Sequence, residues 1–200
     1  MRTNKRCVFK GAATALVTPF SDGSVDYDAF GKMIDYQLDG GINAVVVAGT
    51  TGESPTLTES ERRKMTRYAK DRIGGKVPLI VGCGSNDASA MLENSKNAAT
   101  DGADALLLVT PYYNKATDLG LERSFLSIAD KTDLPIILYN VPSRTGVDIP
   151  VPVYRSLAEH ENIVAVKEAS GNIGKIAEII AETDGKLGVY SGNDDQTVPV

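Results

Sequence analysis

The stretch NIVAVKEASGN, residues 162–172, places a lysine at the end of an apolar run. β-Branched and small apolar residues before a Ser/Gly/Asn turn are typical of a buried parallel strand that leads into a helix. If Lys167 alternates with Ile163 and Ala165 towards an apolar interior, Glu168 faces the helices. Desolvation would then lower the lysine pKa and leave a neutral amine that can form a Schiff base with a carbonyl. A lysine that extends to solvent or pairs with a carboxylate fits the same pattern equally well.

Two further candidates stand in ILYNVPSRTG, residues 137–146. Tyr139 closes the preceding strand, and pairing of parallel neighbours would place its phenol near Lys167, where it can act as an acid or base. A core tyrosine with its hydroxyl bonded at the rim is the commoner outcome. Arg144 follows in a Pro/Ser/Gly loop, from which its guanidinium could clamp a carboxylate. A solvated loop arginine would give the same sequence pattern.

Hydroxyl groups follow two earlier apolar runs. In AGTTGES, residues 48–54, Thr50 and Thr51 stand among small residues whose backbone N–H groups could form an anion-binding nest. A glycine turn capped by Ser and Thr has the same composition. In TPYYN, residues 110–114, the second tyrosine is Tyr113, and a tyrosine pair suits an interface patch as well as a catalytic element.

Composition limits what these residues can do. The chain has 200 residues, 42% hydrophobic and 24% charged, with a net charge of -5, which predicts one globular domain and disfavours a nucleic-acid partner. Cys7 and Cys83 are far apart and His160 is the only histidine, so neither a disulfide framework nor a Cys/His metal site is predicted. A reducing cytoplasm fits this usage. No segment reaches transmembrane length, and Lys10 interrupts the apolar stretch that a signal peptide would need.

The elements that position these residues alternate between strand and helix. Between the apolar runs lie helical patterns such as the one after Thr58, where Glu61 has capping-box spacing and Gly74 stands at the expected stop. Because the unusual polar residues follow the strand ends, we predict a (β/α)₈ barrel; a doubly wound sheet is the competitor, but no GxGxxG follows a strand. The seven predicted strands lie in these runs: TALVTPF, NAVVVAGTTG, VPLIVGCG, DALLLVTP, LPIILYNVP, NIVAVKEAS and LGVYSGND.

Seven strands are one fewer than this barrel has. A barrel of this class typically needs about 250 residues, and the sequence stops as a seventh helix would begin. The expectation is therefore a single, incomplete barrel domain over residues 1–200, truncated after the seventh strand, without the eighth strand and the C-terminal helices. An open barrel would expose the edges of its first and last strands.

Taken together, these motifs closely resemble the dihydrodipicolinate synthase family, a branch of the class I pyruvate-dependent aldolase superfamily. GTTGES, TPYYN, YNVPSRTG and VKEASGN occur in the family's order and spacing, and the resemblance runs from GAATALVTPF to YSGND. It implies a cytoplasmic lyase of lysine and diaminopimelate biosynthesis that condenses pyruvate with aspartate 4-semialdehyde to 4-hydroxy-tetrahydrodipicolinate. It also implies no metal or organic cofactor, no nucleic-acid or membrane partner, and a homodimer or homotetramer.

The resemblance also implies a role for each site residue. Lys167 would form the Schiff base with pyruvate, and Tyr139 would pass protons. Thr51 would link that phenol to Tyr113, which in this family reaches the neighbouring subunit's site. The remaining residues would bind substrate: Thr50 the pyruvate carboxylate, Arg144 the carboxylate of aspartate semialdehyde, and Gly192, in YSGND, through its backbone.

Two alternatives stay open within the resemblance. A sister aldolase that cleaves sialic acid or a keto-deoxy sugar acid would share Lys167 and Tyr139, but would usually lack the threonine pair together with the PSRTG arginine. An inactive truncated barrel with a structural or regulatory role is the second. Feedback inhibition by lysine is disfavoured, because Ala90 stands where inhibited members carry a glutamate, although Asn86 fits their pattern.

Overall fold

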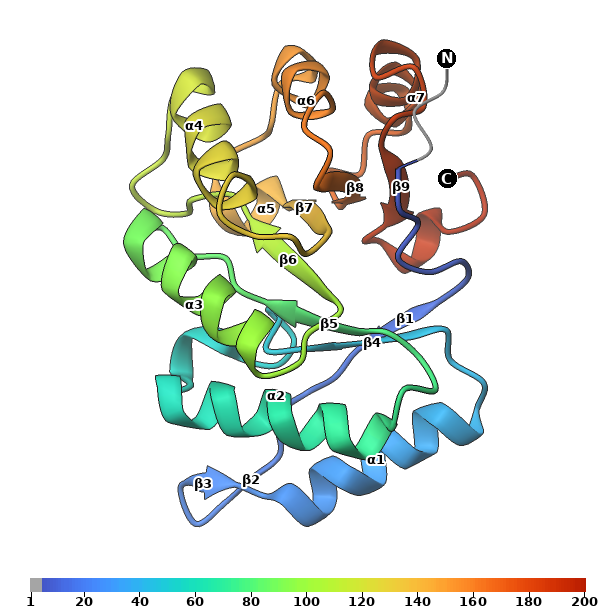
Figure 1. Cartoon of the computed structure of the whole chain (residues 1–200). Coiled ribbons are helices and arrows are strands. Elements are labelled where there is room, and N and C mark those ends of the chain that lie inside the picture. The colour runs from blue at the N-terminus through green and yellow to red at the C-terminus, as the bar shows by residue number, and fades with distance from the viewer. Residues whose placement is uncertain (1–4) are drawn as a thin grey trace. The chain divides into compact units, whose positions relative to one another are not determined.

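The computed structural model describes residues 5–200 and contains a parallel sheet of seven strands and a small antiparallel hairpin (Figure 1). The strands of the larger sheet are β1 (Ala13–Ala15), β4 (Ala44–Val47), β5 (Leu79–Gly82), β6 (Ala105–Val109), β7 (Ile136–Asn140), β8 (Ile163–Glu168) and β9 (Gly188–Ser191). The hairpin is formed by β2 (Phe20–Ser21) and β3 (Ser24–Val25). The helices are α1 (Tyr27–Asp39), α2 (Glu59–Ile73), α3 (Ala88–Thr100), α4 (Asp118–Ala129), α5 (Pro142–Thr145), α6 (Val151–Leu157) and α7 (Ile173–Glu182), with short 3₁₀ turns η1 (Ser54–Thr56) and η2 (Asp194–Gln196).

The strand order distinguishes the two predicted α/β folds. The larger sheet runs β1-β4-β5-β6-β7-β8-β9, so its strands follow their order in the chain, with a helix in each connection. A doubly wound sheet reverses its strand order at a switch point, which this order lacks. The predicted α/β fold of the barrel type, with seven strands, is therefore confirmed. The β2–β3 hairpin and α5 were not predicted.

The chain divides into two compact units. One contains the described residues up to Cys7, Gly84–Glu93 and Leu107–Val200, and the other contains Val8–Cys83 and Asn94–Leu106. The interpretation of residues 1–200 as one incomplete barrel domain stays a prediction. No helix within the described part of the chain is long and apolar enough to cross a membrane.

In the unit that contains Val8–Cys83, helix α2 begins and ends at the residues that the sequence predicted. Thr58 caps α2, its side chain accepts from the Glu61 N–H, and the Glu61 carboxylate accepts from the Thr58 N–H at 2.9 Å, so the capping box is confirmed. Gly74 ends the helix in the left-handed conformation, with φ of 59°. Helices α1 and α2 lie side by side (Figure 1), where the rings of Phe30 and Tyr68 lie 6.0 Å apart.

In the other unit, β7, β8 and β9 pair in parallel. Tyr139 pairs with Lys167 and Lys167 with Tyr190, so three neighbouring strands end at the same level. Helix α6 packs against α4 on one side and α7 on the other. This unit holds most of the candidate site.

Lys5 joins the start of the described chain to the end of α6 and the start of β8. Its ammonium donates to three backbone carbonyls, at 2.5 Å to Ala158, 2.8 Å to His160 and 2.7 Å to Ile163. The carbonyls at the end of a helix have no partners within the helix, and a cation near them also interacts favourably with the helix dipole. The lysine thus serves as a C-terminal cap for α6.

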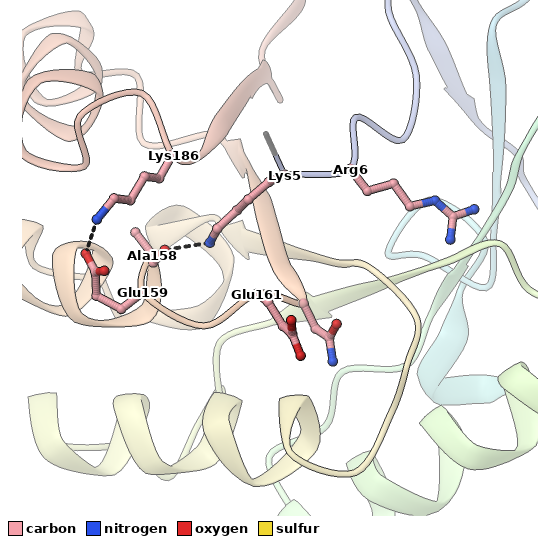
Figure 2. Close-up of a pocket in the computed structure, with 7 residues that line it drawn as sticks. Lys5, Arg6, Ala158, Glu159, Glu161 and Lys186 are labelled. Carbon is pink, nitrogen blue, oxygen red and sulfur yellow. Dashed lines mark hydrogen bonds and ion pairs between the residues drawn. The ribbon is translucent and has the colours of Figure 1, made fainter. Parts of the chain in front are cut away.

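A cavity of about 410 Å³ opens beside this contact (Figure 2). Burial lowers the pKa of Lys5 to about 8, with the Glu159 carboxylate opposing that shift and the Lys186 ammonium adding to it. Glu159 and Lys186 pair with each other at 2.5 Å. The cavity is lined by Lys5, Arg6, Ala158, Glu159, Glu161, Asn162 and Lys186.

We predict that Lys5→Met destabilises the fold, because methionine offers no donor to the three carbonyls that the ammonium now contacts. The free energy of unfolding should fall by about 1–2 kcal/mol, the usual cost of leaving such groups without a donor. Urea denaturation at neutral pH measures it. The control is Lys10→Met at an exposed position; equal stabilities of the two variants would contradict the capping role.

Candidate functional site

Lys167 and Tyr139 form the centre of the candidate site. They are register partners on β8 and β7, and the Lys167 Nζ lies 4.4 Å from the centroid of the Tyr139 ring. Tyr139 is buried and Lys167 is half-buried. Burial lowers the pKa of Lys167, the charge of Asp194 opposes this shift, and the charge of Arg144 adds to it. The two predicted neighbours are therefore in contact, and the amine is poised to lose its proton more easily than an ordinary lysine.

The alternation along β8 explains why the lysine faces Tyr139. Glu168, the next residue, points to the other side, where its carboxylate accepts from the Tyr154 hydroxyl of α6 at 2.9 Å. This confirms the prediction that Glu168 faces the helices. In the strand IVAVKE every residue except Lys167 is buried, so the lysine emerges from an apolar strand only at its carboxyl end.

The lack of a side chain at Gly192 leaves space for the side chain of Lys167. Its N–H donates to the Glu168 carbonyl at 2.8 Å, which brings the chain after β9 close to the end of β8. A Cβ at this position would lie 2.7 Å from the Ala169 Cβ and 3.2 Å from the Lys167 Cε. Any larger residue would therefore push on the lysine stem. The backbone therefore approaches β8 closely at Gly192. The role that the family resemblance implies for this glycine, binding substrate through its backbone, stays a prediction.

Asp194 influences the pKa of Lys167 and was not among the predicted site residues. It opens η2, and its carboxylate is the charge that opposes the lowered pKa of Lys167. The only signal was an acidic pair, Asp194 and Asp195, directly after the last strand end. Gln196 fixes this turn, because its side-chain amide donates to the Gly171 carbonyl at 2.9 Å.

Arg144 lies in a helical turn and not in the predicted loop. Pro142 begins α5 and Gly146 ends it with φ of 69°. Proline at the first helical position and glycine just past the last one favour such a turn, so the prediction of a loop is wrong. The guanidinium is exposed, and its charge contributes to the lowered pKa of Lys167.

Tyr113 is in the same unit but is almost entirely exposed. Its side chain is 89% accessible, and its backbone has φ of 70°, which is uncommon for a bulky residue. Asn114 beside it donates to the Asn86 carbonyl at 3.3 Å. A strained, exposed tyrosine is typical of a functional or interface position.

Thr50 and Thr51 belong to the other unit, where both are exposed at the turn after β4. The structure thus assigns Lys167, Tyr139, Arg144 and Gly192 to one unit and the two threonines to the other. Their roles remain predictions.

The turn after β4 does not present all the N–H groups of an anion-binding nest. The N–H groups of Gly52 and Ser54 donate to the Gly49 carbonyl, and that of Glu53 donates to the Thr50 carbonyl. These bonds close turns, as in the alternative of a glycine turn.

Potential metal ligands are not grouped within the described part of the chain. Among residues 5–200, no set of three or more His, Cys, Asp and Glu side chains could hold a metal ion.

Fold and site together define a class: α/β proteins of the barrel type, with a desolvated lysine at the carboxyl end of a strand. Residues 8–200 match the model of the dihydrodipicolinate synthetase family, and the chain belongs to this family.

Similar proteins agree with this assignment. A 4-hydroxy-tetrahydrodipicolinate synthase of Alkaliphilus oremlandii is 47% identical over 96% of this chain and 67% of its own length. A chloride-inhibited dihydrodipicolinate synthase of Acinetobacter baumannii, solved with pyruvate, has a TM-score of 0.92 and 40% identity over 96% of this chain and 66% of its own. A monomeric dihydrodipicolinate synthase variant has a TM-score of 0.92 and 42% identity, covering 94% of this chain and 64% of its own. The chain spans about two thirds of the length of these relatives.

We predict that the Lys167 amine becomes reactive at lower pH than an ordinary lysine. Burial disfavours its ammonium form, so the neutral amine should appear below the usual pKa of 10.5. Reductive methylation with formaldehyde and cyanoborohydride across a pH series, followed by peptide mapping, measures the midpoint at Lys167. A lysine in a model peptide is the reference, and a Lys167 midpoint at or above the reference would refute the prediction.

Gly192→Ala should disturb both the fold and the lysine. Its Cβ would overlap the Ala169 Cβ and press on the Lys167 Cε, so we expect a loss of about 1–3 kcal/mol in the free energy of unfolding. The rate of methylation at Lys167 should change as well. Gly188→Ala is the matched control in β9, since a Cβ there meets its nearest neighbour at an ordinary 3.6 Å; equal effects of both substitutions would argue against a close fit.

Proposed function

We propose that this chain carries the Schiff-base-forming lysine of a 4-hydroxy-tetrahydrodipicolinate synthase, a lyase of lysine and diaminopimelate biosynthesis. It would condense pyruvate with aspartate 4-semialdehyde to 4-hydroxy-tetrahydrodipicolinate. The observation that carries the proposal is the half-buried Lys167 amine over the Tyr139 ring, in a member of this family. The A. baumannii relative that was solved with pyruvate supports the choice of the first substrate.

Lys167 supplies the nucleophile. Its neutral amine attacks the keto carbon of pyruvate, and loss of water from the carbinolamine gives an iminium. The iminium withdraws electrons, so a methyl proton leaves and an enamine forms. The enamine carbon then adds to the aldehyde carbon of aspartate semialdehyde, and the aldehyde oxygen takes up a proton to become a hydroxyl group. The amino group of the semialdehyde finally attacks the regenerated imine carbon, and ring closure releases the Lys167 amine. The imine on Lys167 serves as the electron sink, so the reaction requires no organic cofactor.

Tyr139 is the proposed proton carrier. Its ring touches the lysine amine, so its hydroxyl belongs to the same small region of the site. We propose that it passes the protons that carbinolamine formation and dehydration require. Thr51 and Tyr113 would extend this path as a proton relay.

The remaining roles concern binding. Thr50 would hold the pyruvate carboxylate, Arg144 the carboxylate of the semialdehyde, and the Gly192 backbone would line the pocket. The exposure of Tyr113 supports a role at a neighbouring subunit in a homodimer or homotetramer. A cytoplasmic location is part of the same proposal.

Borohydride trapping tests the proposal directly. After incubation with pyruvate and sodium borohydride, we expect intact mass spectrometry to show one carboxyethyl adduct, which peptide mapping should place on Lys167. Tyr139→Phe should slow trapping by about 100-fold, the scale of a lost general acid or base. Addition of aspartate semialdehyde before the borohydride should consume the enamine and reduce the adduct.

Two variants control this experiment. Lys167→Arg keeps the charge but removes the amine and should abolish the adduct, while Lys186→Arg changes a lysine that is ion-paired with Glu159 and should not. A folded, unaltered chain that gives no adduct would refute the proposed function, as would equal labelling of Lys167→Arg.

A further inference from the structure

The Glu168 carboxylate is buried on the side of β8 that faces away from the chemistry. It is only 1% exposed, directly follows Lys167, and points towards α6. A carboxylate is among the groups least often buried without a partner, and an apolar residue would pack there at lower cost. Its presence therefore needs an explanation.

Hydrogen-bond donors surround both carboxylate oxygens. Oε1 accepts from the Asn140 Nδ2 at 2.9 Å and from the Ser170 N–H at 2.8 Å. Oε2 accepts from the Tyr154 hydroxyl at 2.9 Å and from the Asn140 Nδ2 at 3.1 Å. An ionised carboxylate only accepts, so it matches this set, whereas an amide would place its own donor opposite one of them.

These bonds join the ends of the two strands that carry the candidate site. Asn140 pairs with Glu168 one register step beyond Tyr139 and Lys167. The backbone repeats the connection, because the Ala169 N–H donates to the Asn140 carbonyl at 2.9 Å. Lys167 and Tyr139 therefore lie on one face of the two strands, and the hydrogen-bonded pair of Glu168 and Asn140 lies on the opposite face.

Asn140 extends the network to the segment after α5. Its Oδ1 accepts from the Ile149 N–H at 3.1 Å, and its Nδ2 donates to the Asp148 carboxylate at 2.7 Å. Asp148 in turn pairs with the Lys175 ammonium of α7. The network around Glu168 therefore connects β7, β8, α6, α7 and the chain that follows the Arg144 helix.

We propose that Glu168 is a positioning residue, which holds the Lys167 amine against Tyr139 by fixing the ends of β7 and β8 through Asn140, Tyr154 and Ser170. The identity of Lys167 as the nucleophile comes from the proposed function, and the network explains how that nucleophile is held. A slip or rotation at the end of β8 would move the amine away from the ring and admit water.

Two variants distinguish an effect of Glu168 on the position of the Lys167 amine from an effect of the Glu168 charge. Glu168→Gln keeps the size but replaces an acceptor oxygen with a donor group, so one of its present partners loses its bond. Tyr154→Phe removes one donor to Glu168 and leaves the charge of the network unchanged. The control is Glu182→Gln, which alters an exposed carboxylate paired with Arg155.

Two measurements are made on each folded variant. One is the pH midpoint of reductive methylation at Lys167, which needs no substrate. The other is the rate of pyruvate trapping by borohydride over a range of pyruvate concentrations. We expect Glu168→Gln and Tyr154→Phe both to raise the methylation midpoint, because a displaced amine is better hydrated. Both should slow trapping about tenfold with little change in the half-saturating pyruvate concentration, since a misplaced amine lowers the rate of attack on bound pyruvate.

Contrary results would overturn the inference in distinct ways. Unchanged midpoints and trapping rates in both folded variants would leave Glu168 with a structural role alone. A midpoint that falls in Glu168→Gln and stays constant in Tyr154→Phe would show an effect of charge and not of position. If the unaltered chain traps no pyruvate, the proposed function fails, and the methylation midpoints still decide the role of Glu168.

Discussion

Parallel pairing of β7 with β8 is the constraint on which the candidate site depends. This register places Tyr139 opposite Lys167 and Asn140 opposite Glu168. Because side chains alternate along a strand, one pair faces the interior and the other faces the helices. A shift of one residue in β8 would turn its side chains to the opposite faces of the sheet, so that the Lys167 amine and the Glu168 carboxylate would change places.

The two faces of β8 have opposite effects on the charged form of the side chain that each one holds. Around Glu168, four hydrogen bonds replace lost water, which is how a protein tolerates a buried carboxylate whose effective desolvation otherwise costs several kcal/mol. Tyr154 takes part, and its own pKa is raised by burial and by the carboxylate. At Lys167, burial is the largest influence on the pKa and favours the neutral amine. The same strand end therefore stabilises one charge and disfavours the other.

Much of this arrangement was visible in the sequence, because it follows from local patterns. The seven strands, the Thr58 capping box and the approach of Tyr139 to Lys167 all follow from alternation and from parallel pairing of neighbouring strands. The network around Glu168 was not visible, because its two side-chain donors, Tyr154 and Asn140, stand 14 and 28 positions before the glutamate. Asp194 was missed for a similar reason, since only the folded chain brings η2 close enough to influence Lys167.

The charges near Lys167 also bear on the proposed reaction. A keto acid brings its own carboxylate to the amine, and an added negative charge favours the ammonium form, which is not nucleophilic. Asp194 acts in the same direction, whereas Arg144 opposes it. A guanidinium stays charged at any working pH, so it can offset an incoming carboxylate without taking up a proton. In the proposed reaction, Arg144 would therefore have two roles: it would bind a carboxylate, and its charge would help to keep the Lys167 amine neutral in the presence of anionic substrates.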